Sequence, residues 1–511
     1  MSIFYTKPVK SLIDHSNGDE TSFKRTLGRL NLTALGIGAI IGAGIFVLSG
    51  QAAAQYAGPA IILSFVISAV SCAFAGLCYA ELASMIPVAG STYTYAYATL
   101  GELIAWIIGW DLILEYLFAA STVSVGWSGY VTSFLKDFGI VFSPEYIAAT
   151  GTKMINLPME GWKPFTHQLG VALAQKGILI DQLQQTTAIV NVPAMLINLI
   201  CTVILVIGIK ESANVNNIMV ILKVAVILLF IGFGFFFINY DNLTPFIIPE
   251  TIDAAGVSHY GWNGILTGSA VIFFAYIGFD AVSTAAQEAK DPQKDVPYGI
   301  LVSLAVSTIL YILVALVLTG IVNYKELNVS DPIALAVNTM GESMIWLRPV
   351  IKIAAIAGLS SVILVMLMAQ PRIFYSMAKD GLLPKWFSDM HPKYKTPYKS
   401  SILCGLVSMV IGGVLPIDIL GELVSIGTLL AFVIVCAGVM ILRKTRPDIP
   451  RVFRTPWVPF VPIVGALICM WQMSSLPLDT WIRLFVWLAI GLVIYFIFGK
   501  RNAAKQRAES I

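Results

Sequence analysis

The chain has 511 residues, of which 57% are hydrophobic and only 12% are charged, and its formal net charge is +3. Soluble domains carry about 25% charged residues because their surfaces face water. The composition therefore excludes a water-soluble globular protein and predicts an integral membrane protein whose surface faces lipid.

The polar parts of the sequence exclude further classes. There is no dense basic tract to bind nucleic acid, and the four histidines lie far apart, so we expect no nucleic-acid partner, no metal site and no cofactor. All six cysteines fall inside apolar runs, which predicts packing residues rather than a disulfide framework. The polar first 30 residues lack the apolar core of a cleavable signal peptide, so we expect the first hydrophobic segment to be retained.

Apolar segments long enough to cross a bilayer recur along the chain. A helix needs about 20 apolar residues to cross about 30 Å of hydrocarbon. The sequence therefore predicts an all-α membrane protein with twelve transmembrane helices. Their approximate limits are 33–57, 59–86, 101–133, 187–209, 213–238, 262–288, 298–322, 346–378, 400–416, 421–442, 457–476 and 480–499.

Lysine and arginine concentrate in the connections on one side of these segments. Because such residues are retained in the cytoplasm during insertion, we expect both termini to be cytoplasmic in a plasma membrane, the inner membrane if the host is bacterial. The long outer connection is predicted to form either a small extracellular cap or a disordered loop. The expected organisation is a tail 1–32, a core 33–442 (33–238 and 262–442) with the outer loop 134–186, two further helices in 457–499, and a tail 500–511.

Two spans contain signals for an interrupted helix. The first reads GIGAIIGAGIF over 36–46, where each glycine disfavours helix by about 1 kcal/mol relative to alanine. It predicts either close packing of a neighbouring helix through Gly38 and Gly42 or an unwound segment near the membrane midplane. In the sixth span, Gly278 and Asp280 interrupt the apolar run FFAYIGFD over 273–280.

Matching interruptions five spans apart are typical of transporters built from two inverted repeats. Spans one to five and six to ten are predicted to be such repeats on this ground alone, since the halves show no clear residue similarity. Free N–H groups at the start of a half-helix attract a carboxylate, and free carbonyls at the end of one attract an ammonium group. The pattern therefore favours a zwitterionic amino acid, bound in a cavity that covers the irregular backbone.

Four stretches resemble the amino acid–polyamine–organocation superfamily: GAIIGAGIF (38–46), CYAEL (78–82), PVAGSTY (87–93) and FAYIGFD (274–280). The chain is most similar to bacterial members of the cationic amino acid transporter family, from about residue 23 to 499. The resemblance implies a five-plus-five inverted-repeat (LeuT-like) fold with broken helices one and six. The substrate-binding residues that it implies are Ile40, Ile41, Gly42, Ala43, Gly44, Ile45, Phe274, Ala275, Tyr276, Ile277, Asp280 and Met366.

Some of these residues have a structural alternative. Asp280 is predicted either to cap the second half of span six or to attract the substrate ammonium group. Met366 is predicted either to pack in the core or to shorten the pocket as a large, flexible wall. Ala43 departs from the family pattern, because relatives can carry a hydroxyl residue there.

Two charged residues lie deep in spans. Lys223 lies about 15 Å into span five, where a charge costs at least about 2.5–3.5 kcal/mol, so it needs polar partners. We expect the backbone of 38–41 and the hydroxyls of Ser360 and Ser361 to provide them, either for stability alone or, as the resemblance implies, with the lysine proton as the coupling ion. Glu115, near the middle of span three, is predicted to be a protonation partner or a neutral packing residue.

The predicted function is secondary active import of amino acids by proton-coupled symport and alternating access. The alternative is an amino acid exchanger that ignores a proton gradient. A sodium-coupled symporter is disfavoured because the lysine repels the ion, and no set of catalytic side chains predicts an enzyme. Expected partners are the amino acid, the proton and membrane lipid; a small membrane protein is left open, as is the preferred amino acid.

Overall fold

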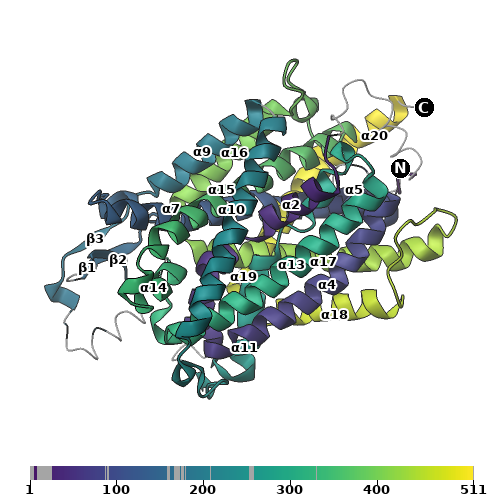
Figure 1. Ribbon diagram of the computed structural model, residues 1–511. Helices are drawn as coiled ribbons and strands as arrows, with labels where there is room; N and C mark the ends of the chain where they lie inside the picture. Colours follow the sequence, from purple (N-terminus) through teal and green to yellow (C-terminus); the bar gives the residue numbers. More distant parts are fainter. Residues whose placement is uncertain are drawn as a thin grey trace.

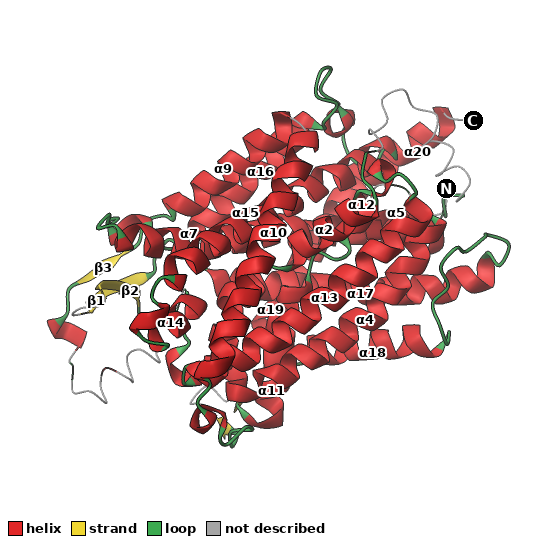
Figure 2. Ribbon diagram, viewed as in Figure 1, coloured by secondary structure: helices red, strands yellow, loops and turns green. Residues whose placement is uncertain are grey.

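The computed structural model describes residues 5–8, 26–86, 88, 91–157, 161–165, 173, 178, 180–207, 209–252, 258–329 and 331–509. Most of this part of the chain is helical (Figure 2), and it contains eight helical segments long and apolar enough to cross a membrane, with three shorter apolar helices. The expected helical membrane protein is confirmed. The long segments are Arg29–Met85, Glu102–Asp137, Asn216–Phe237, Gly261–Thr284, Pro292–Ile321, Leu347–Lys379, Ile417–Thr445 and Leu478–Arg507; the shorter ones are Val192–Ile207, Tyr398–Val414 and Phe460–Ser474.

Helix limits follow local signals as well as hydropathy. The helix α13 begins at Pro292, earlier than the predicted limit of 298, because proline is well tolerated in the first turn, where its missing N–H has no helical partner. All six cysteines are buried and free, as predicted. The helices are α2 (Arg29–Ile40), α3 (Ser49–Ala52), α4 (Ile61–Met85), α5 (Ser91–Thr99), α6 (Glu102–Ile113), α7 (Ala119–Asp137), α9 (Val192–Ile207), α10 (Ile209–Gly234), α11 (Gly261–Ile272), α12 (Ala281–Thr284), α13 (Pro292–Ile321), α14 (Pro332–Thr339), α15 (Leu347–Lys379), α16 (Tyr398–Val414), α17 (Ile417–Thr445), α18 (Phe460–Ser474), α19 (Leu478–Ile494) and α20 (Lys500–Glu509).

The helix contacts form a regular pattern. Helix α4 packs against α13 and α11, and α2 packs against α13 (Figure 1). Helix α7 packs against α15, and α9 against α16. Helix α10 contacts α2 and α15, in the same way that α17 contacts α11 and α7. The contacts are the same when α2, α4, α7, α9 and α10 are exchanged, in this order, for α11, α13, α15, α16 and α17.

Part of the long connection 134–186 forms a small antiparallel sheet. Its strands are β1 (Lys153–Leu157), β2 (Gly161–Pro164) and β3 (Gln185–Thr187), in the order β2-β1-β3. The sheet lies at the opposite end of the molecule from both termini (Figure 1). A second pair of strands, β4 (Thr251–Ile252) and β5 (Ser258–His259), precedes α11.

The two ends of the described chain meet at Glu102, at the start of α6. Its backbone N–H donates to the Tyr5 carbonyl at 3.0 Å, and its carboxylate pairs with Arg507 of α20. The hydroxyl of Tyr495 donates to the same carboxylate at 2.9 Å, and the Tyr5 ring lies 4.8 Å from the Arg507 guanidinium carbon. These contacts, with residues of high helix propensity, explain why the predicted tail 500–511 is helical through Glu509.

Candidate functional site

The first membrane segment is interrupted where the glycine-rich stretch predicts it. Helix α2 ends at Ile40, and Ile41 takes an extended conformation with ψ 96°. A π-helix then runs from Gly44 to Leu48, and the N–H groups of Ile45 and Phe46 both donate to the Gly42 carbonyl at 3.2 Å. The first N–H groups of a helix have no helical acceptor, so this restart offers donors beside the break.

The sixth membrane segment is interrupted at the same level. After α11, a 3₁₀ turn (Phe273–Tyr276) leads into Ile277, which is extended with ψ 136°. Gly278 has φ +114°, a conformation that favours glycine, and α12 follows. Asp280 precedes α12, but its side chain makes no capping hydrogen bond, so the predicted capping role is wrong.

The two interruptions touch each other. A Cβ added at Gly44 would overlap the Cα and Cβ of Ala275. The restart of the first segment therefore packs directly on the 3₁₀ turn of the sixth, which a side chain at position 44 would prevent.

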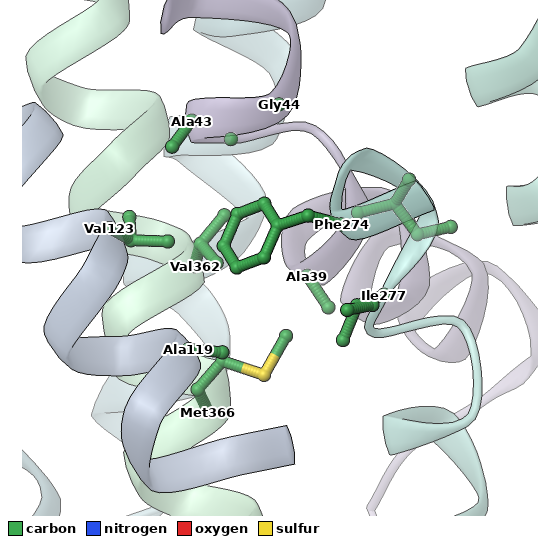
Figure 3. Close-up of a pocket in the computed structure, with 11 residues that line it drawn as sticks. Ala39, Ala43, Gly44, Ala119, Val123, Phe274, Ile277, Val362 and Met366 are labelled. Atoms are coloured by element: carbon green, nitrogen blue, oxygen red, sulfur yellow. The ribbon is translucent and has the colours of Figure 1, made fainter. Parts of the chain in front are cut away.

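A small cavity lies between these interruptions and the two further helices α7 and α15 (Figure 3). The Phe274 ring and the Met366 thioether point into it (Figure 3). The lining residues are Ala39, Ile40, Gly42, Ala43, Gly44, Ala119, Val123, Phe274, Ile277, Val362 and Met366.

Seven of the expected substrate-binding residues line this cavity, and five do not. Ile41 and Ile45 turn their carbonyls to Lys223 and to the Ser49 hydroxyl. The Tyr276 hydroxyl donates to the Phe65 carbonyl at 3.0 Å. The remaining two of the five are Ala275 and Asp280, which the structure places in other contacts described below.

Sequence reasoning missed a tyrosine that joins both interruptions. The Tyr311 hydroxyl on α13 lies 2.6 Å from the Ile40 carbonyl oxygen and 2.8 Å from that of Ala275. Ile40 and Ala275 are two of the residues expected to bind the substrate, and a single O–H serves both of their carbonyls. It also missed Ala119, Val123 and Val362, which share one wall of the cavity with Met366.

The buried amine of Lys223 holds the first interruption. Its Nζ donates to the carbonyls of Gly38 at 2.8 Å and Ile41 at 2.7 Å, and to the Ser361 hydroxyl at 2.9 Å. Three acceptors satisfy all three donors of an ammonium group. Ser360 is not a partner, contrary to expectation: it faces away and accepts from Trp127 at 2.9 Å.

Glu115 lies in a π-helical turn (Leu114–Phe118) between α6 and α7, a feature often found at functional sites. Its carboxyl group is fully buried and interacts with that of Asp280, which also accepts a hydrogen bond from the Tyr116 hydroxyl. Two adjacent buried carboxyl groups cannot both be charged without a large cost. The pair is therefore a place where a proton can be held, one turn from Ala119 in the cavity wall.

Comparisons with known proteins give the chain its family. The amino acid permease family model matches residues 27–498. The chain is 44% identical to a branched-chain amino acid permease of Bacillus subtilis (98% of each chain) and 42% identical to a methylthioribose transporter of the same organism (98% of this chain, 99% of the relative). It is 37% identical to cationic amino acid transporter 4 of Arabidopsis thaliana (88% of this chain, 68% of the relative).

These relatives are transporters rather than enzymes, and their similarity extends through both interruptions and the cavity between them. The predicted superfamily is confirmed: the chain belongs to the amino acid permease family of the amino acid–polyamine–organocation superfamily.

Proposed function

We propose that this permease imports amino acids across the plasma membrane by proton-coupled symport and alternating access. The observation that carries the proposal is the position of Lys223. Its amine bonds directly to the Gly38 and Ile41 carbonyls, at the point where the first segment unwinds. When the amine loses its proton it keeps two of its three donors, so one of its three acceptors, the Gly38 and Ile41 carbonyls and the Ser361 hydroxyl, loses its partner and the first interruption changes with protonation. A proton and a substrate bound beside the same interruption are thereby linked.

In this proposal the interrupted backbone binds the amino group and the carboxylate of the substrate. The carboxylate lies near the restart at 42–45, and the ammonium group near the carbonyls of Ile40, Phe274, Ala275 and Ile277. The support is that both interruptions meet at one cavity. Binding of the ammonium group requires the Tyr311 hydroxyl to share or release two of these carbonyls.

The fold that we propose has twelve spans, the first ten of them in two inverted repeats of five, with both termini in the cytoplasm. The segment Arg29–Met85, at 57 residues, is long enough for two crossings, which with the other long and short helices gives twelve. The contact pattern that survives exchange of the two groups of five supports the repeat. Both termini lie at the same end of the molecule (Figure 1), as an even number of spans requires.

The carboxyl pair of Glu115 and Asp280 is proposed as a second proton-holding group. Asp280 lies on the interrupted sixth segment, and Glu115 lies on the π-helical turn that packs against α17 and α15. A proton held there allows the sixth segment to move without exposing a charge in the membrane. Met366 is proposed as the selectivity wall, since its thioether points into the cavity (Figure 3).

The test uses purified full-length protein in proteoliposomes. Uptake of radiolabelled amino acids is measured with an inward proton gradient, with the gradient collapsed by a protonophore, and with unlabelled amino acid preloaded. We expect accumulation only while the gradient persists. Uptake that needs internal amino acid and ignores the gradient would establish the exchanger instead.

A further inference from the structure

The relatives leave the substrate open, because their names specify branched-chain amino acids, methylthioribose and cationic amino acids. The two classes of amino acid differ in the side chain, which the interrupted backbone does not bind, and methylthioribose has neither an α-amino group nor a carboxylate. The chemistry of the remaining cavity walls must therefore decide between them.

Every side chain on those walls is apolar. Ala119 and Val123 lie one turn apart on α7, Val362 and Met366 lie one turn apart on α15, and Phe274 faces them (Figure 3). Among the described residues that line the cavity, none carries a charged or hydrogen-bonding side chain. The polar groups that this cavity offers come from the backbone of the two interruptions.

The ionisable groups nearby do not line the cavity. The Lys223 amine is fully satisfied by three acceptors on the far side of the first interruption. The Glu115 carboxyl group interacts with that of Asp280 and does not line the cavity. The Met366 side chain packs beside Gly278, since a Cβ placed at that glycine would lie 2.9 Å from the Met366 Cε.

A guanidinium or ammonium group at the end of a long side chain would be buried here without a partner, and so would the hydroxyls of a sugar. Both are costly, because a buried polar group needs a hydrogen bond. An aliphatic side chain gains from burial in the same place. We expect this discrimination to be at least comparable to the effect of one methylene more or less in an apolar pocket, which changes affinity by roughly 10–200-fold.

We infer that the substrate is an α-amino acid with an aliphatic side chain, such as valine, leucine or isoleucine, and that Val123, Val362 and Ala119 form its specificity wall. The inference rests on the proposed function, since it takes the backbone site as given. It assigns the wall to residues outside the two interruptions.

The test is thermal stabilisation of the purified full-length protein by each amino acid and by methylthioribose, because a ligand of the native state raises its stability. We expect valine, leucine and isoleucine to bind roughly 100-fold more tightly than arginine, lysine or methylthioribose. Arginine or lysine binding as tightly as valine would overturn the aliphatic class and leave amino acid transport standing. Stabilisation by methylthioribose and by no amino acid would overturn the proposed function itself.

A pair of isosteric variants locates the wall. In Val362→Thr the added hydroxyl enters the cavity, and we expect valine to bind roughly 10-fold more weakly relative to threonine. Val365→Thr is the matched control, because Val365 is buried on the same helix but does not line the cavity. In this variant the ratio of valine affinity to threonine affinity should stay within about 2-fold of the wild-type ratio. If the ratio of valine affinity to threonine affinity changed equally in both variants, Val362 would not belong to the specificity wall.

Discussion

Lys223 and Lys352 both have fully buried side chains, on the neighbouring helices α10 and α15, yet their partners differ in charge. Lys352 pairs with the Asp137 carboxylate at 2.6 Å, and Arg348 pairs with the same carboxylate. Lys223 donates only to two carbonyls and a hydroxyl. One buried amine is thus in a charged cluster, and the other is among neutral dipoles.

The difference shows how a membrane protein can use the same side chain in two ways. The Lys352 ammonium has a charged partner in the half-exposed Asp137 carboxylate, and this pair joins the ends of α7 and α15. The partners of Lys223 carry no charge that must be balanced, and a neutral amine can still donate to two of them. Of the two lysines, Lys223 is therefore the one to which we assign the loss and regain of a proton in the proposed transport cycle.

The largest expected effect comes from Lys223→Ala. Without the amine, protonation no longer changes the first interruption, so gradient-driven accumulation in proteoliposomes should be lost. Substrate binding, measured by thermal stabilisation, should persist in part because the backbone site remains. Proton-driven accumulation at the wild-type level would remove the coupling role and with it the distinction between the two lysines.

A substitution at the contact between the interruptions tests whether Lys223 acts through the substrate site. In Gly44→Val the new side chain overlaps Ala275, so we expect substrate affinity to fall by at least about 100-fold, or about 2.7 kcal/mol. The matched control is Gly232→Val in α10, where an added Cβ meets nothing within 4 Å. Unchanged affinity in Gly44→Val would count against binding by the interrupted backbone.

Lys352→Met should affect stability and leave coupling intact. The variant leaves the Asp137 carboxylate with Arg348 as a partner, so we expect unfolding free energy to fall by about 1.5–3 kcal/mol. The measurement is the denaturation midpoint in detergent, beside proton-driven uptake per folded molecule. If that uptake lost its proton dependence, Lys352 would share the role assigned here to Lys223.

The smallest effect is expected from Tyr311→Phe. Loss of one hydroxyl shared by the Ile40 and Ala275 carbonyls should cost about 1 kcal/mol of stability, because one hydrogen bond is worth about that much. Both carbonyls are then free for an ammonium group, so amino acid affinity should not fall along with stability. If stability and amino acid affinity fell together, the Tyr311 hydroxyl would hold the two carbonyls in place for the substrate instead of competing with the substrate for them.

Much of the site was predictable because its signals are local. Glycines at 42 and 44 and the Gly278–Asp280 pair weaken helices wherever they occur, and both interruptions are found there. A lysine deep in a span has to find acceptors, and a glycine-rich neighbour provides free carbonyls. The expected partners at 38–41 are accordingly the ones that Lys223 contacts.

The remainder depends on helix rotation and on contacts between distant segments. Ser360 and Ser361 are adjacent, and only the 100° rotation between them decides which one faces Lys223. Tyr311 is one of 19 tyrosines in an apolar sequence, and nothing local marks it as the one between two interruptions. Val123 and Val362 read as ordinary core residues for the same reason.

The meeting of both chain ends at Glu102 has a practical consequence for anyone attaching a reporter. A fusion partner joined at Arg507 or directly before Tyr5 would compete with the contacts that fix α20 and residues 5–8 to the start of α6. A spacer placed after Glu509 keeps these contacts intact. Conversely, the separation of two dyes attached beside Tyr5 and beside Glu509 would report when this junction opens.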